Sequence, residues 1–432
     1  MTLPGCLIPN CVWSAAPSSL RSHYLGHHPR ILFCWELGGG LGHLYRILPL
    51  AAELARRGCA VGCALPDAGR REGEGEGVDE IPRTTLLQAP HWKPPARRFP
   101  PSLNYAQNLL RNGYWHSDSL RGQLRAWLLL LERFQPDLVI AEHAPTALLA
   151  ARIAKVPRAA IGTGFSLPPL ASPMPTLQPW FDLPLERLRA AEDELLDAVN
   201  PVLRTLGSPP LGRTADIFEG THTFLCTLPE MDHYGPRANA RYRGPVLHTR
   251  QDAPPAGLPA DGRGFFLYLS PEHRHFDAIL AAVRRTGQSA LAFLPGLDEA
   301  RVQALETKRF RVTTTPVDLF AVAGACGAAI TQGGHNATAL LLRSGMPLLL
   351  CPSHLEQQLL AYRLQEQGLA LTVNYMNPAP DFSSKLATLA SGRGPGPSAR
   401  AFALEHQRFD PSRQISSLVD DFVALAEGSA FV

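Results

Sequence analysis

The chain has 432 residues, 45% of them hydrophobic and 18% charged, so it holds enough apolar side chains for a folded protein of two domains and is not disordered. Its 41 basic and 38 acidic residues leave a net charge of +3, which gives no electrostatic basis for binding nucleic acid. No apolar run is long enough to cross a bilayer, and the eight scattered cysteines are typical of buried thiols in a reducing compartment. We therefore expect a cytoplasmic protein, free or peripheral at the inner membrane face; composition does not determine its oligomeric state.

Residues 1–29 lack the continuous apolar segment of a signal peptide, and we expect them to form a disordered leader. From Arg30 the pattern becomes regular, with an apolar run (RILFCW), a glycine loop (GGGLGH) and a segment that ends at Gly58 and has apolar side chains at helical spacing. A second apolar run, AVGCAL, follows. The order strand, loop, helix, strand predicts the opening unit of a parallel doubly wound sheet.

The same alternation continues along the chain. PDLVIAEH, APTALLAARIAKVP and RAAIGTG read as strand, helix and strand, and the pattern restarts at FFLYL after a segment rich in proline and glycine. We predict an N-terminal domain over 30–235, a linker over 236–263, a C-terminal domain over 264–400, and a terminal helical segment over 401–432 that packs on either domain. The acidic trio Glu192-Asp193-Glu194 predicts a solvated helix face, and we expect no metal site.

A glycine pair, Gly333-Gly334, lies between the strand-like run GAAIT and the helix-like run HNATALLLRSG. Glycines at this turn let a ligand approach the free N–H groups at the start of a helix, where an anion is stabilised. Asn336 and Thr338 fall in the first helical turn and could reach the same anion or cap the helix. The pattern predicts an anion site, although a glycine pair by itself also fits a tight turn.

Three segments, taken in this order, resemble the GT-B-fold glycosyltransferases of the UDP-glucuronosyl/UDP-glucosyltransferase type, in their bacterial natural-product-like branch. They are GGGLGHLYRILPLAAELARRG, QPDLVIAEHAPTALLAARIAKVP and TQGGHNATALLLRSGMPLLLCPSHLEQQLLAYRLQEQG. The resemblance covers most of residues 30–400. It implies an α/β fold of two tandem Rossmann-like, doubly wound domains that face a cleft, with the acceptor on the N-terminal domain and the nucleotide-sugar on the C-terminal domain.

The resemblance also implies a role for each matching residue. His43 matches the general base that takes the proton of the acceptor hydroxyl, and Glu142 matches the carboxylate that orients it. The glycine loop is represented by Gly39, Gly40 and Gly42. The remaining matches are donor-binding: Gln332, Gly333, Gly334, His335, Asn336 and Thr338 at the diphosphate, and Glu356 and Gln357 at the sugar hydroxyls.

Several positions depart from the family pattern. Gln332 stands where a phosphate-binding histidine is usual, His335 where plant-type members have tryptophan, and Leu340 where they have a ribose-binding glutamate. Arg46 replaces a proline three residues after the histidine, a GHxxR variant that recurs among other GT-B enzymes. These departures leave the nucleotide base unspecified, with UDP- or dTDP-sugars as the expected donors.

The residues also admit plainer interpretations. His43 could be a core or capping histidine, Glu142 could pair with a surface arginine while His143 serves the site, and Glu356 and Gln357 could only favour the start of a helix.

From the resemblance we predict an inverting, metal-independent glycosyltransferase that needs no cofactor, with a small-molecule or lipid hydroxyl as acceptor. The alternatives are a degraded binding or accessory protein of the same fold, a sugar-nucleotide epimerase and, more weakly, an NAD-dependent oxidoreductase suggested by the glycine loop.

Overall fold

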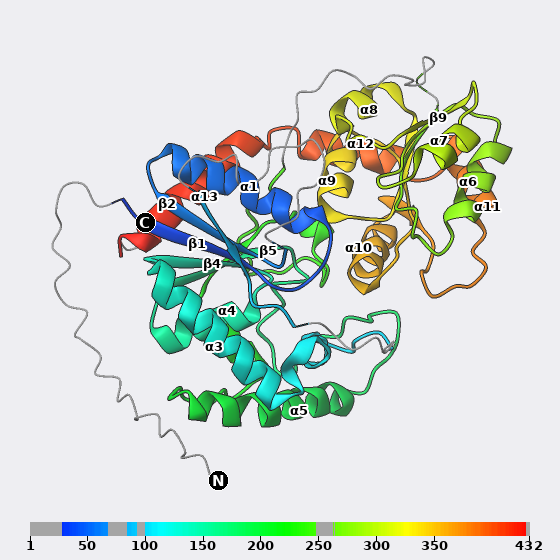
Figure 1. Cartoon of the computed structure of the whole chain (residues 1–432). Coiled ribbons are helices and arrows are strands. Elements are labelled where there is room, and N and C mark those ends of the chain that lie inside the picture. The colour runs from blue at the N-terminus through cyan, green and yellow to red at the C-terminus, as the bar shows by residue number, and fades with distance from the viewer. Residues whose placement is uncertain (1–27, 68–83, 93–99, 248–261, 263, 429–432) are drawn as a thin grey trace, which may run out of the picture.

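The computed structural model describes residues 28–67, 84–92, 100–247, 262 and 264–428, and these form two α/β domains that lie side by side (Figure 1). Residues 1–27 of the predicted leader and 248–261 of the predicted linker lie outside the described residues.

The N-terminal sheet is parallel throughout, in the order β3-β2-β1-β4-β5-β6. Its strands are β1 (Arg30–Trp35), β2 (Ala60–Leu65), β3 (Thr84–Gln88), β4 (Leu138–Glu142), β5 (Arg158–Gly162) and β6 (His222–Leu225). Along β1, Ile31 and Phe33 enter the core on one face, and Leu32 and Cys34 enter the core on the other. Because both faces are covered, the strand has the continuous apolar run seen in the sequence.

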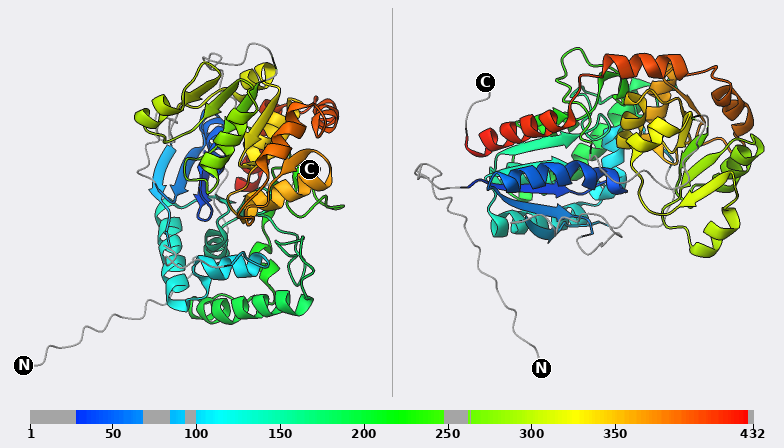
Figure 2. Two further views of the ribbon diagram at one scale, coloured as in Figure 1. Left: turned by 90° about the vertical axis from the view of Figure 1, so that its right-hand side faces the viewer. Right: turned by 90° about the horizontal axis from the view of Figure 1, so that it is seen from above.

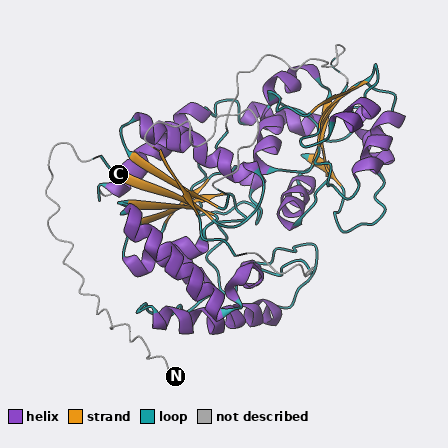
Figure 3. Ribbon diagram, viewed as in Figure 1, coloured by secondary structure: helices purple, strands orange, loops and turns teal. Residues whose placement is uncertain are grey.

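Helices cover both faces of this sheet, as Figure 3 shows. One layer contains α1 (Leu41–Arg56) and α13 (Pro411–Ala426), and the other contains α3 (Ser117–Phe134), α4 (Pro145–Ala154) and α5 (Leu185–Thr205). Shorter elements are α2 (Tyr105–Leu109), a π-helical turn (Leu110–Tyr114) and the 3-10 turns at Thr214–Phe218 and Pro229–Met231. In α5 the prediction of a solvated acidic face is wrong for Glu192, which is buried and whose carboxylate accepts from the Met174 N–H at 2.9 Å in place of water.

The C-terminal sheet repeats the same topology, in the order β12-β11-β10-β7-β8-β9. Its strands are β7 (Phe265–Tyr268), β8 (Ala290–Phe293), β9 (Phe310–Thr313), β10 (Ala328–Thr331), β11 (Leu348–Leu350) and β12 (Ala370–Thr372). Its helices are α6 (Phe276–Arg285), α7 (Glu299–Leu305), α8 (Leu319–Ala325), α9 (His335–Arg343), α10 (Leu355–Glu366), α11 (Phe382–Ala390) and α12 (Gly396–Glu405). In each sheet the order reverses between two central strands, β1 and β4 or β7 and β10, and such switch points are where open α/β sheets bind ligands. The predicted fold class, two tandem doubly wound α/β domains, is confirmed.

The chain crosses between the domains twice. After α12, which packs on α9, the chain returns to the N-terminal domain, where α13 lies against α1 (Figure 2). Phe422 of α13 is fully buried, with its ring 5.1 Å from Phe224 and 6.4 Å from Phe33. The last helix therefore completes the core of the first domain.

We expect Phe422→Ala to lower the free energy of unfolding by about 3–5 kcal/mol, because it leaves a cavity between β1, β6 and α13. Chemical denaturation measures this loss. Arg413→Ala, at a solvent-exposed position of the same helix, is the matched control and should change stability by less than about 0.5 kcal/mol. Equal losses in the two variants would show that α13 does not complete this core.

None of the helices in the described part of the chain combines the length and apolarity needed to span a bilayer. The six cysteines that the structure describes are all buried, and the thiols of five of them, Cys34, Cys59, Cys63, Cys226 and Cys351, are free.

Candidate active site

His43 and Glu142 meet at the switch point of the N-terminal sheet. His43 lies in the first turn of α1, directly after the loop that follows β1, and Glu142 is the last residue of β4, in register with Trp35 on the neighbouring strand. The His43 Nδ1 atom lies 2.7 Å from the Glu142 Oε1 atom. The Trp35 ring stacks on the imidazole, with 5.1 Å between ring centroids. The structure thus brings the two predicted residues together. The Trp35 ring packs on the face of the imidazole, and the Glu142 carboxylate contacts its Nδ1 atom.

Arg46 is a third member of this cluster and has no place in the predicted set of site residues. It lies one turn after His43 on α1 and donates from Nη1 to the same Oε1 atom of Glu142. The side chains of Arg46 and Glu142 are 4% and 0% exposed. Glu142 does pair with an arginine, but the arginine is buried inside the site rather than on the surface.

In the glycine loop, the backbone conformation requires glycine at Gly38 and Gly40. Both have a φ of +86°, which L-residues rarely adopt, whereas a Cβ on Gly39 or Gly42 would meet no described atom within 4 Å. A Cβ on Gly38 would lie 2.4 Å from the Nε2 atom of His43. Gly38, which is missing from the predicted set, keeps this imidazole nitrogen accessible.

The start of α9 supplies polar atoms at the switch point of the C-terminal sheet. Gly333 adopts a φ of +83° between β10 and α9, as the strand-to-helix turn predicts. Behind it, Asn336 Nδ2 and Thr338 Oγ1 are buried and have no hydrogen-bond partner within the described residues. Unpaired donors of this kind and the free N–H groups of a first helical turn are the groups that stabilise an anion at the start of a helix.

His335 holds the two domains together. Its Nε2 atom lies 2.7 Å from Oγ1 of Thr227, a residue that follows β6 of the N-terminal domain. Its ring stacks on His233, which also comes from the N-terminal part of the chain, with 6.2 Å between centroids. Burial and, to a smaller extent, the positive charge of Arg46 lower the pKa of His335 to about 3, so His335 is neutral at pH 7. Thr227 and His233 could not be inferred from the sequence, because their partner lies about a hundred residues further along the chain.

The other predicted donor residues line the turns around α9 and α10. Gln332 accepts from the Ser270 N–H at 3.0 Å and contacts the Ser353 hydroxyl through Nε2. Glu356 and Gln357 lie in the first turn of α10, where the Gln357 Oε1 atom accepts from the Ser353 N–H at 2.9 Å. The two loops that end at α9 and α10 are thus joined through Ser353, which brings Gln332 and the start of α10 together.

Three buried histidines predict a stability that falls in acid. Burial lowers the pKa of His143 and of His335 to about 3, and it holds the pKa of His233 well below its usual value. Because these pKa values are lower in the folded than in the unfolded chain, the stabilisation is complete above pH 6.5 and is lost as the pH falls. At pH 5 His143 and His335 each cost about 2 kcal/mol, because about 1.5 units separate pH 5 from the ordinary histidine pKa of about 6.5 and each unit is worth about 1.36 kcal/mol.

We therefore expect the melting temperature to drop between pH 7 and pH 5. In the His233→Phe variant the drop should be smaller, since phenylalanine takes up no proton and fits the aromatic neighbours Phe165 and His335. His116→Gln, at an exposed position, should follow the wild type. A wild-type melting temperature that does not change over this range would contradict the buried, neutral state of these histidines.

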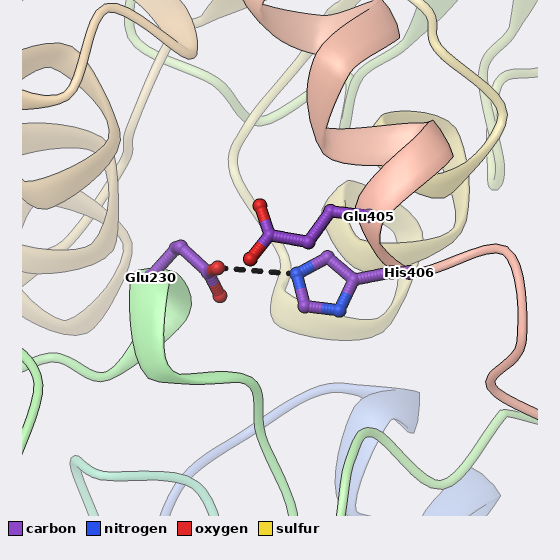
Figure 4. Close-up of side chains that lie close together, drawn as sticks. All are labelled: Glu230, Glu405 and His406. Carbon is purple, nitrogen blue, oxygen red and sulfur yellow. Dashed lines mark hydrogen bonds and ion pairs between the residues drawn. The ribbon is translucent and has the colours of Figure 1, made fainter.

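One group of potential metal ligands was found in the described residues, and it lies at the domain junction. Figure 4 shows Glu230, Glu405 and His406, whose ligand atoms lie within 4.8 Å of one another. His406 Nε2 and Glu230 Oε1 are 3.1 Å apart and form an ion pair when the histidine is protonated. The group comes from the Pro229–Met231 turn and the end of α12, and it includes neither His43 nor any residue of α9. The group links the Pro229–Met231 turn to the end of α12 and shares no residue with the site described above.

Known proteins with similar sequences are glycosyltransferases, although no family model matches the chain. A PGL/p-HBAD biosynthesis glycosyltransferase of Mycobacterium tuberculosis is 26% identical over 321 residues, which is 65% of this chain and 72% of that protein. A PGL/p-HBAD biosynthesis rhamnosyltransferase of Mycobacterium bovis is 28% identical over 295 residues, or 62% and 63% of the two chains.

Solved structures with a similar fold are also glycosyltransferases. The crystal structure of the glycosyltransferase VinC in complex with dTDP superposes with a TM-score of 0.62 at 18% identity, over 93% of this chain and all of that one. The sequence relatives and the two doubly wound domains agree, and the chain is a glycosyltransferase of the GT-B fold.

Proposed function

We propose that the protein transfers a sugar, with inversion and without a metal ion, from a nucleoside diphosphate donor on α9 to an acceptor hydroxyl at His43. The observation that carries this proposal is the contact of 2.7 Å between His43 Nδ1 and Glu142 Oε1 at the switch point of the N-terminal sheet. A histidine that donates from Nδ1 to a carboxylate keeps the lone pair of Nε2 free, and this nitrogen accepts the proton of the acceptor hydroxyl.

The reaction is a single displacement. As Nε2 takes the proton, the acceptor oxygen forms a bond to the anomeric carbon, and the bond from that carbon to the phosphate oxygen breaks on the opposite side. The nucleoside diphosphate leaves with the electron pair. The free N–H groups at the start of α9, together with Asn336 and Thr338, would stabilise the charge that develops on it. These donors provide a reason to expect transfer without a metal ion.

For the donor we propose a UDP- or dTDP-sugar, with dTDP preferred. Leu340 is buried and apolar where similar enzymes place a glutamate on the ribose, so it offers no acceptor to a ribose 2′-hydroxyl. A uridine nucleotide would therefore gain little over a deoxyribose nucleotide at this position. The complex of VinC with dTDP agrees with this preference.

For the acceptor we propose a hydroxyl on an aromatic or otherwise apolar molecule, including a lipid. The rings of Trp35 and His143 lie 5.1 and 5.9 Å from that of His43, and Tyr105 and Phe165 extend this aromatic cluster, 6.4 and 5.9 Å from the His143 ring. Aromatic surfaces of this kind bind flat or apolar groups through buried area. We place the reaction in the cytoplasm, free or at the inner membrane face, because buried cysteines such as Cys34, Cys63 and Cys351 are free thiols.

The test is a turnover assay with UDP-α-glucose or dTDP-α-glucose and a panel of phenols and long-chain alcohols, with and without EDTA. Proton NMR of the product should show a β-linked sugar, formed at the same rate in EDTA. An α-linked product would contradict inversion, and loss of turnover in EDTA would contradict metal independence. Nucleotide release without a glycosylated product would point to an epimerase, and binding without turnover would point to a degraded accessory protein.

A further inference from the structure

Arg46 and His43 share one carboxylate oxygen. Both side chains reach Oε1 of Glu142, His43 through Nδ1 at 2.7 Å and Arg46 through Nη1, while Oε2 of Glu142 has no hydrogen-bond partner in the part of the chain that is described. Glu142 is fully buried and Arg46 is 4% exposed. A buried acceptor without a hydrogen-bond partner, such as Glu142 Oε2, costs free energy of folding. This arrangement therefore calls for an explanation other than stability.

The arginine decides which form the carboxyl group takes. A carboxyl group buried away from water favours the protonated form unless a cation lies beside it, and arginine carries its charge at every pH of interest. A protonated Glu142 would donate a hydrogen bond to Nδ1, and His43 would then carry its own proton on Nε2. An ionised Glu142 can only accept, so Nδ1 must donate and Nε2 keeps its lone pair.

The other charged and titratable groups around His43 do not provide this effect. The His143 ring lies 5.9 Å from that of His43, and the charge of Arg46 acts on His335 of α9. His354, just before α10, is also near enough to His43 for their charges to interact, and burial lowers the pKa of His354. Burial lowers the pKa of His143 and of His335 to about 3, so both are neutral at pH 7. Arg46 is therefore the permanent cation in contact with Glu142 among the described residues.

We propose that Arg46 is a positioning residue, which keeps Glu142 ionised and thereby holds His43 in the tautomer that can accept a proton. This inference rests on the proposed function, because it concerns the base of that reaction. It also explains why a long cation occupies the third position after the histidine, one helical turn away on the same face of α1.

The pH dependence of kcat/KM separates this role from a structural one. In Arg46→Met one proton is held more tightly by the pair of His43 and Glu142, whichever of the two carries it. The acid limb of the profile should therefore move upward by about one pH unit or more, and at pH values below the wild-type limb kcat/KM should fall about tenfold for each unit of that shift. Arg46→Lys keeps the charge and should leave the limb close to the wild-type position. Arg57→Met removes an ion-paired arginine at the far end of the same helix and is the matched control.

An Arg46→Met enzyme that is active, with an acid limb at the wild-type pH, would overturn the inference. If that variant does not fold, the tautomer itself can be read in the wild type by 15N NMR of labelled histidine, with His43→Gln used for assignment. We expect a neutral imidazole protonated at Nδ1 at pH 7, and protonation at Nε2 would overturn the inference equally. A wild-type enzyme without turnover refutes the proposed function instead, whereas the tautomer measurement still decides the role of Arg46.

Discussion

His43→Ala is expected to lower kcat for sugar transfer by about three orders of magnitude, since general base catalysis contributes about 10²–10⁴ to a rate. Donor affinity should remain within a few-fold of the wild type, because His43 lies on α1 of the N-terminal domain and the proposed donor site lies on α9 of the other. Steady-state kinetics gives kcat, and calorimetric titration with a nucleoside diphosphate gives the affinity.

His116→Ala, at an exposed position on the same domain, is the control for this substitution and should keep full activity. The base assignment would be refuted by a His43→Ala enzyme that retains more than about a tenth of the wild-type kcat. A loss of donor affinity in step with kcat would instead mean that His43 holds the two domains in place.

Gly38→Ala should be nearly as damaging, although it adds a single methyl group. The new Cβ would lie 2.4 Å from His43 Nε2 and 3.0 Å from Cε1, so the imidazole must move, and a φ of +86° strains any L-residue. A displacement of about 1 Å in a catalytic group can cost about a hundredfold in rate. We expect kcat/KM to fall by about two orders of magnitude, while the strain lowers stability by about 1–3 kcal/mol.

Gly39→Ala is the matched control, one residue along the same exposed loop. Its Cβ would meet no described atom within 4 Å, so activity and melting temperature should stay close to wild type. Equal activity of the Gly38→Ala and Gly39→Ala enzymes would show that the loop does not position His43 as the structure indicates.

The sequence was sufficient for the parts of the molecule that depend on local patterns. The buried strand of RILFCW, the amphipathic helix that ends at Gly58, and the turn at Gly333 each follow from spacing and from the residues that flank it. The family resemblance then identified His43 and Glu142, which come together because β1 and β4 are neighbours at the switch point.

Features that depend on contacts between distant segments could not be predicted. Arg46 is one of many arginines in the sequence, and its burial becomes visible only when β4 lies beside α1. The contact of His335 with Thr227 joins two domains. The buried carboxylate of Glu192 accepts a hydrogen bond from the Met174 N–H, in a loop 18 residues earlier in the chain. Nothing in the local sequence distinguishes such polar residues from solvated ones.

The central claim is that the start of α9 binds the diphosphate of a nucleotide donor. Thermal unfolding in the presence of dTDP, UDP, GDP, CDP, ADP and NAD tests it most directly, because a ligand that binds only the folded chain stabilises it by about 2.7 kcal/mol at a hundredfold excess over its Kd. We predict that dTDP or UDP raises the melting temperature by several degrees, that NAD does not, and that Asn336→Ala reduces the shift. A protein that melts cooperatively at the same temperature with all six compounds would contradict the account.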